Sequence, residues 1–133
     1  MNNESMHKIF LILGTVLGGL AVALGAFGAH GLKKLVAPET IATYQTGVHY
    51  QMYHALALIL LGILTERTAN SFLNYSGLMF LGGVVFFSGS LYLIVSMQAM
   101  NKAIPTYIGI ITPVGGLLFI IGWILLLLGI IRK

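Results

Sequence analysis

The sequence predicts an all-α integral membrane protein whose four helices run up, down, up and down in a bundle. Hydrophobic residues make up 58% of the 133 residues and charged residues only 8%, whereas a soluble domain carries about 25% charge. The few charges leave four uncharged runs, each longer than the roughly 20 residues that a helix needs to cross a bilayer. The runs lack strand-like alternation, so helices are expected to satisfy their backbone groups in lipid. This composition excludes a water-soluble enzyme, a nucleic-acid binder and a disordered chain.

The membrane-spanning helices are expected near residues 9–29, 42–64, 73–97 and 107–131, within one domain covering residues 1–133. We expect the first span to be retained rather than cleaved as a signal peptide, because its apolar run continues through Phe27, beyond a usual signal core.

The connections between the spans are short. Apolar residues from Leu32 onward recur at helical spacing beside two lysines, which predicts an interfacial turn of helix. Pro38 is expected to open the second helix, because proline lacks the backbone donor that would be unpaired at that position. A polar hairpin over Thr65–Ser71 joins the second and third helices, and Pro105 is expected to open the fourth.

The orientation rests on a small difference in charge. Four spans place both termini on the side of the Thr65–Ser71 hairpin. That side carries Lys8, Arg67, Arg132 and Lys133, and the other side carries Lys33, Lys34 and Lys102. Because the side richer in lysine and arginine faces the cytoplasm, cytoplasmic termini are favoured. Insertion in both orientations stays an alternative.

Small residues recur along three of the spans and are expected to let helices approach closely, since close packing drives helix association in lipid. They are Gly14, Gly18, Ala21, Gly25 and either Gly28 or Ala29 in the first span, Gly82 and Gly89 in the third, and Gly115, Gly122 and Gly129 in the fourth. The last three follow a heptad spacing, which suits a left-handed seam. The spacing is compatible both with packing inside one subunit and with a homo-oligomer.

Polar residues gather in one half of the membrane once the four spans are folded up and down. We predict a pocket there, formed by His30, Tyr50, His54, Ser88, Tyr92, Thr112 and Pro113. His54 lies ten residues beyond Tyr44, about 15 Å along the helix. Pro113 is expected to kink the fourth helix, because it cannot donate a backbone hydrogen bond. A histidine within a span is a functional-site hypothesis, and a neutral histidine that locks helices together is the structural alternative.

The spacing of the polar residues excludes several chemistries. His49 and His54 are five residues apart and point about 140° from each other around a helix, which does not make a metal pair. A Ser–His–Asp hydrolase lacks an acid within the spans, and the chain has no cysteine. We therefore predict no catalytic residue, metal or cofactor.

Three functions stay open. The first is small-ligand or proton-linked binding or permeation through the polar pocket. The second is membrane organisation or assembly through helix oligomerisation, and the third is haem or quinone handling. The expected partners are the lipid bilayer, an unidentified small ligand and another copy of the chain, and nucleic acid is not expected.

Several runs resemble the domain-of-unknown-function-423 family, also described as transmembrane-protein-256-like. They are residues 25–32 (GAFGAHGL), 44–47 (YQTG), 87–92 (FSGSLY) and 111–116 (ITPVGG), followed by Gly122 and Trp123. The resemblance implies a small multi-pass protein, located in bacteria in the plasma membrane, and brings no activity, substrate or cofactor with it. The matching runs overlap the predicted polar half of the bundle.

Overall fold

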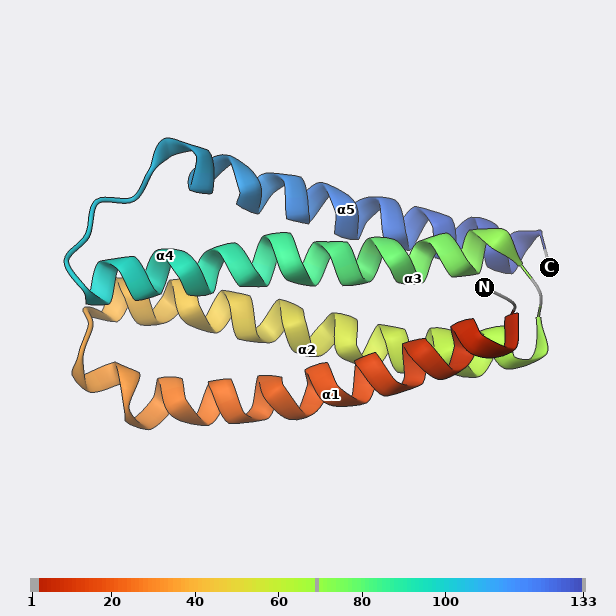
Figure 1. Ribbon diagram of the computed structural model, residues 1–133, viewed down its shortest axis with the longest axis horizontal. Helices are drawn as coiled ribbons and strands as arrows, with labels where there is room; N and C mark the ends of the chain where they lie inside the picture. Colours follow the sequence, from red (N-terminus) through yellow and green to blue (C-terminus); the bar gives the residue numbers. More distant parts are fainter. Residues whose placement is uncertain (1–2, 69, 133) are drawn as a thin grey trace.

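The computed structural model describes residues 3–68 and 70–132 and consists of four long helical rods lying side by side (Figure 1). The rods are α1 (Asn3–His30), α2 (Pro38–Arg67), a third rod of α3 (Ser71–Gly83), η2 (Val84–Ser88) and α4 (Gly89–Ala99), and α5 (Thr106–Ile131). Each is long and apolar enough to cross a membrane. The predicted all-α fold with four membrane-spanning helices is confirmed.

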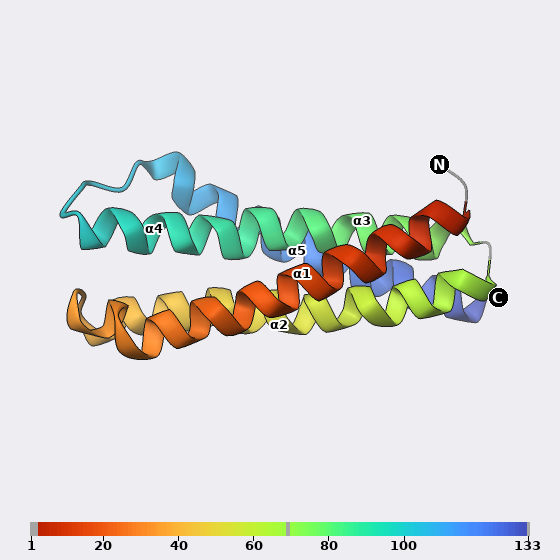
Figure 2. The ribbon, with the colours of Figure 1, turned by 60° about the horizontal axis from the view of Figure 1, so that its bottom comes forward.

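The rods alternate in direction. α1 begins and α5 ends at the same end of the molecule as the α2–α3 connection, and the α1–α2 and α4–α5 connections lie at the opposite end (Figure 1). The termini therefore share a side with the polar hairpin, as the four-span prediction requires. The two central rods are α2 and the α3–η2–α4 rod, with α1 packed mainly on α2 and α5 packed mainly on α3 and η2 (Figure 2).

Local sequence sets the ends of the rods. The predicted interfacial turn is a short 3₁₀ helix, η1 (Leu32–Lys34), which buries Leu32. Pro38 is the first residue of α2, as expected, and Asn70 caps α3 by accepting a hydrogen bond from the amide of Phe72. Pro105 lies one residue before α5 rather than inside its first turn.

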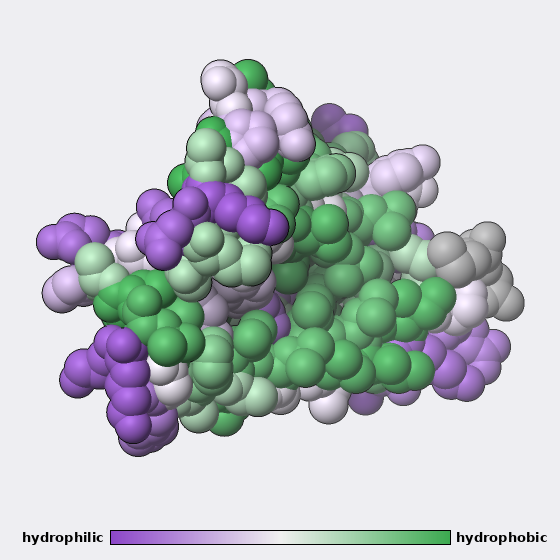
Figure 3. All heavy atoms as spheres, turned by 60° about the vertical axis from the view of Figure 1, so that its left-hand side comes forward, coloured by the Kyte–Doolittle hydropathy of each residue, from purple (hydrophilic) through white to green (hydrophobic). Residues whose placement is uncertain are grey.

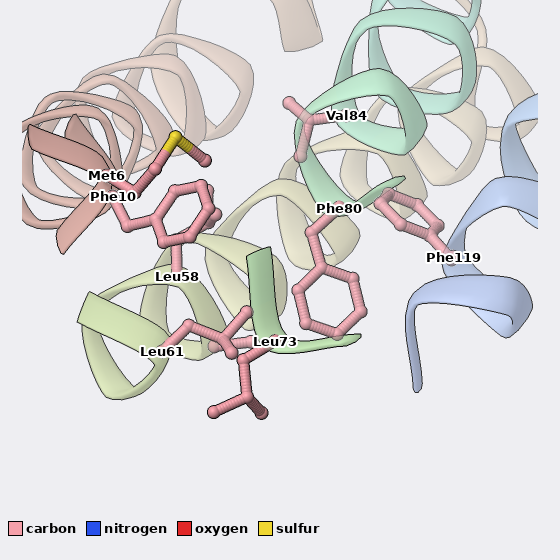
Figure 4. Packing of buried hydrophobic residues seen from close by; sticks show 9 residues of the cluster. Met6, Phe10, Leu58, Leu61, Leu73, Phe80, Val84 and Phe119 are labelled. Atoms are coloured by element: carbon pink, nitrogen blue, oxygen red, sulfur yellow. The ribbon is translucent and has the colours of Figure 1, made fainter. Parts of the chain in front are cut away.

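The main apolar core lies toward the end that holds the α2–α3 connection. Side chains from all four rods meet there (Figure 4). Phe10 and Phe80 are fully buried. Two glycines of α3 make room for rings of the outer helices: Phe10 packs on Gly77, and Phe119 packs on Gly83. Missing side chains on the central rod thus allow large side chains of the outer helices to reach the centre.

The small residues of α1 face α2 within the same chain. A Cβ atom at Gly14 would lie 2.8 Å from the carbonyl oxygen of Ala55, and one at Gly28 would meet the ring of Tyr44. Gly18 and Gly25 face α2 with more space, and Ala21 is buried between them. These residues therefore hold α1 on α2.

The heptad glycines of α5 face the third rod. Gly122 lies against the ring of Phe80, Gly129 lies against Leu73, and Gly115 lies against the backbone of η2. Elsewhere on the rod, a Cβ atom at Gly82 would lie 3.3 Å from Leu118 of α5, whereas Gly89 is exposed and faces no neighbouring helix.

Candidate functional site

His54 lies on α2 and faces α5. Among the predicted pocket residues that face α5 it is the most buried, with 3% of its surface exposed. Its Nδ1 donates to the backbone carbonyl of Tyr50 at 2.7 Å, and its Nε2 accepts from Nε1–H of Trp123 on α5 at 3.1 Å. One ring nitrogen donates and the other accepts, which is the pattern of a neutral imidazole. Protonation would place two donors, Nε2–H and the indole N–H, against each other.

Aromatic rings enclose His54 from three elements. The ring of Phe119 stacks on the imidazole with centroids 3.6 Å apart and planes 10° apart. Phe80 meets the imidazole edge-on at 5.2 Å, and Tyr50, one turn earlier on α2, lies nearly parallel to it at 6.2 Å. Such aromatic contacts add specific geometry to the burial of apolar surface. His54 therefore joins α2 to α3 and α5.

A groove of about 520 Å³ opens beside this cluster, between α2 and α5. It is lined by Tyr50, His54, Phe87, Pro113, Gly116, Leu117, Phe119, Ile120 and Trp123. Tyr50 and Trp123 form its rim and are 41% and 47% exposed. Because the flanks of membrane-spanning helices face lipid, the groove opens sideways toward the bilayer. The hydroxyl of Tyr50 has no hydrogen-bond partner among the described residues.

Two backbone irregularities border the groove. The segment η2 is a π-helical turn, in which the amide of Gly89 donates to the carbonyl of Val84 five residues earlier. Opposite it, Pro113 lies inside α5 and supplies no amide hydrogen to the carbonyl of Gly109. Single π-turns inside α-helices are frequent at functional sites. Here the π-turn carries Phe87 into the groove.

The other predicted pocket residues lie elsewhere. Ser88 donates to the carbonyl of Gly47 at 2.6 Å, and Thr112 shares a hydrogen bond of 2.6 Å with Ser90. His30 is exposed at the end of α1. The structure thus brings Tyr50, His54 and Pro113 together at the groove and separates them from these three.

Tyr92 belongs to a chain of hydrogen bonds between three rods. Its hydroxyl donates to Oε1 of Gln51 at 2.7 Å, and Nε2 of Gln51 donates to the carbonyl of Leu17 at 2.9 Å. Gln51 is 3% exposed and was absent from the predicted pocket. The residue type alone does not predict that Gln51 joins helices, because glutamine is common both at the membrane–water interface and in contacts between helices.

The aromatic wall contributed by α5 was not among the predicted pocket residues. Phe119 and Trp123 are four residues apart and share a helix face, but they lie in the half of the membrane that is poor in polar residues. The i, i+4 aromatic pair was the available signal. No group of three histidine, aspartate or glutamate side chains that could hold a metal ion occurs among residues 3–68 and 70–132.

A family model described as "Protein of unknown function (DUF423)" matches residues 24–116. The chain belongs to the DUF423 family. The match begins in the second half of α1 and ends just after Pro113, so it includes η2 and the α2 half of the groove. The resemblance found in the sequence is confirmed.

Relatives of similar length extend the match to nearly the whole chain. The UPF0382 membrane protein SAB0533 of Staphylococcus aureus is 42% identical over 91% of this chain and 93% of its own length. The UPF0382 membrane protein YwdK of Bacillus subtilis is 39% identical over 94% of this chain and 98% of its own length. Both are described as membrane proteins, in agreement with the four apolar rods. No solved structure matches the chain.

Proposed function

We propose that the protein binds a lipid-soluble small molecule in the groove between α2 and α5, taken up sideways from the bilayer. The observation that carries the proposal is the aromatic groove itself, with four aromatic side chains and the buried His54 around a volume of about 520 Å³. Binding pockets are concave, mostly apolar and equipped with few polar groups. The free hydroxyl of Tyr50 at the rim offers one such group.

The hydrogen bonding of the polar half favours binding over proton-linked permeation. Both nitrogens of His54 are engaged, and the side chains of Ser88, Tyr92 and Thr112 bond to neighbouring helices. In lipid such bonds hold helices together. A proton path would need exchangeable groups that are not already committed to helix contacts.

The alternative of assembly through the predicted glycine stripe draws less support. Gly14, Gly18, Gly25 and Gly28 face α2, and Gly115, Gly122 and Gly129 face the third rod. These glycines serve contacts inside one chain, so an oligomer would have to use other surfaces. Location in the plasma membrane, which the family resemblance implies, and cytoplasmic termini, which the lysine and arginine distribution favours, remain part of the proposal.

Trp123 provides a direct test, because it is the only tryptophan of the chain and lines the groove. The full chain in detergent micelles is titrated with a short-chain alkyl naphthoquinone, which quenches indole fluorescence on contact, while Trp123 emission is recorded. Saturable quenching is expected. Quenching that rises linearly without saturation, as for simple partition into the micelle, would contradict the proposal.

Two glycine variants of α5 sharpen this test. Gly116→Leu places a large side chain in the groove, where a Cβ atom has room at 3.8 Å from Phe87, and should abolish saturation. Gly109→Leu is the matched control two turns away, where nothing lies within 4 Å of the added Cβ. This variant should leave the saturable quenching of Trp123 unchanged. Equal curves for both variants would place the probe outside the groove.

A further inference from the structure

A second cavity, of about 400 Å³, lies at the end of the bundle that holds the α1–α2 connection. It is lined by Gly28, Ala29, Lys33, Val36, Pro38, Ile41 and Gln45. The end of α1, the turn η1 and the start of α2 form its walls. Figure 3 brings this end forward and shows hydrophilic residues gathered there beside a continuous hydrophobic surface. The cavity therefore lies where the apolar flank of the bundle meets the polar end.

The lining of the cavity contains one cationic side chain, Lys33, and one amide side chain, Gln45, with aliphatic side chains between them. Lys33 and Gln45 make no hydrogen bond or ion pair with another described residue, so both polar groups are available. Val36 and Ile41 supply aliphatic surface between them. The nearest carboxylate in sequence, Glu39, is exposed and does not line the cavity.

The two polar groups lie at different depths. Pro38, Ile41 and Gln45 follow i, i+3, i+7 spacing and share one face of α2. Gln45 is seven residues into the helix from Pro38, which is about 10 Å along the axis. Lys33 lies in η1, beyond the last residue of α1. The cavity thus offers a cation at the membrane surface and a hydrogen-bond donor deeper in the interface.

We propose that this cavity binds one anionic phospholipid, with its phosphate at Lys33 and an ester carbonyl at Gln45. In a glycerophospholipid the phosphate lies at the surface, the ester carbonyls lie deeper and the acyl chains follow, which is the order of charge, amide and aliphatic wall in the cavity. A lysine beside membrane-spanning helices attracts an anionic headgroup. The site is separate from the α2–α5 groove and does not depend on its occupant.

The test uses the delipidated full chain in detergent with equal amounts of phosphatidylglycerol and phosphatidylcholine bearing the same acyl chains. Native mass spectrometry counts the lipids retained. We expect one retained lipid with a preference for phosphatidylglycerol. Lys33→Gln should lower that preference about fivefold, the loss expected for one lysine at an anionic surface. Lys34→Gln, which removes the same charge from the adjacent residue outside the cavity lining, should change it less than twofold.

Further variants separate this site from other sources of lipid or anion binding. Gln45→Leu should weaken retention of both lipids while keeping their ratio, because an ester is common to both. An excess of inorganic phosphate should leave the bound lipid in place. Equal losses in Lys33→Gln and Lys34→Gln would indicate diffuse attraction to the surface and overturn the site. Displacement by inorganic phosphate, or no preference in the unmodified protein, would also overturn it.

Discussion

Replacement of Gly115 by alanine tests how α5 is held on the third rod. A Cβ atom at this position would lie 2.7 Å from the carbonyl carbon of Phe86 and closer still to the amide nitrogen of Phe87. Ordinary contacts begin near 3.4 Å, so α5 and η2 would have to separate by more than about 0.7 Å. The opposing atoms belong to the backbone, and no side-chain rotation can relieve the overlap.

The adjacent glycine supplies the matched control. A Cβ atom at Gly116 would lie 3.8 Å from the ring of Phe87, in ordinary contact. Both alanine variants share the gain in helix propensity, about 1 kcal/mol over glycine, so this gain cancels in their difference. Overpacking costs about 1–3 kcal/mol. We therefore expect Gly115→Ala to have a free energy of unfolding about 1–3 kcal/mol below that of Gly116→Ala.

Reversible unfolding in mixed micelles titrated with sodium dodecyl sulfate measures this difference, with circular dichroism reporting helix content and Trp123 fluorescence reporting the α2–α5 contact. Trp123 should lose its native environment at lower dodecyl sulfate in Gly115→Ala. Equal stability of the two variants would refute the close backbone contact between α5 and η2.

Two further predictions concern polar side chains that join rods, and the same titration measures both. In a double-mutant cycle, Tyr92→Phe and Gln51→Leu should show a coupling energy of about 0.6 kcal/mol, the average for hydrogen bonds between membrane helices; additive effects would mean that the 2.7 Å contact contributes nothing. Asn70→Ala should cost about 1–2 kcal/mol, because Asn70 both caps α3 and donates to the carbonyl of Gly129, whereas Ser71→Ala at the neighbouring exposed position should change stability by less than about 0.5 kcal/mol.

The four helices could be predicted because the physics that defines them is local. The few charges mark where the chain leaves the hydrocarbon, and an uncharged run of helix length has one way to satisfy its backbone in lipid. The start of α2 at Pro38 followed from the missing amide hydrogen of proline. α1 begins at Asn3, before its predicted span, because a helix can continue beyond the membrane and hydropathy does not mark its end.

The site was harder to predict because it depends on which way side chains point. The apolar run of the third span predicts an uninterrupted helix, whereas η2 adds a residue to one turn and rotates the following residues by about 100°. Ser90 and Tyr92, which follow this turn, therefore face neighbours that regular spacing could not identify. A gathering of polar residues predicts a pocket, but it equally fits hydrogen bonds between helices, and the hydroxyls of Ser88 and Tyr92 form such bonds between rods.

The groove follows from the distribution of small and large residues on α5. Gly115, Gly122 and Gly129 bring one face of the helix onto the third rod. Phe119 lies at the border of that face and packs both on Gly83 and on His54, and Trp123 lies farther toward α2. These rings reach His54 but keep the backbones of α2 and α5 apart, since an indole and a stacked phenyl ring need space that glycine does not. Because α5 carries glycines on one face and aromatic rings on the next, it leaves a wedge-shaped gap beside α2. The bond between Trp123 and His54 fixes the width of that wedge, so the residues that hold the bundle together also shape the groove.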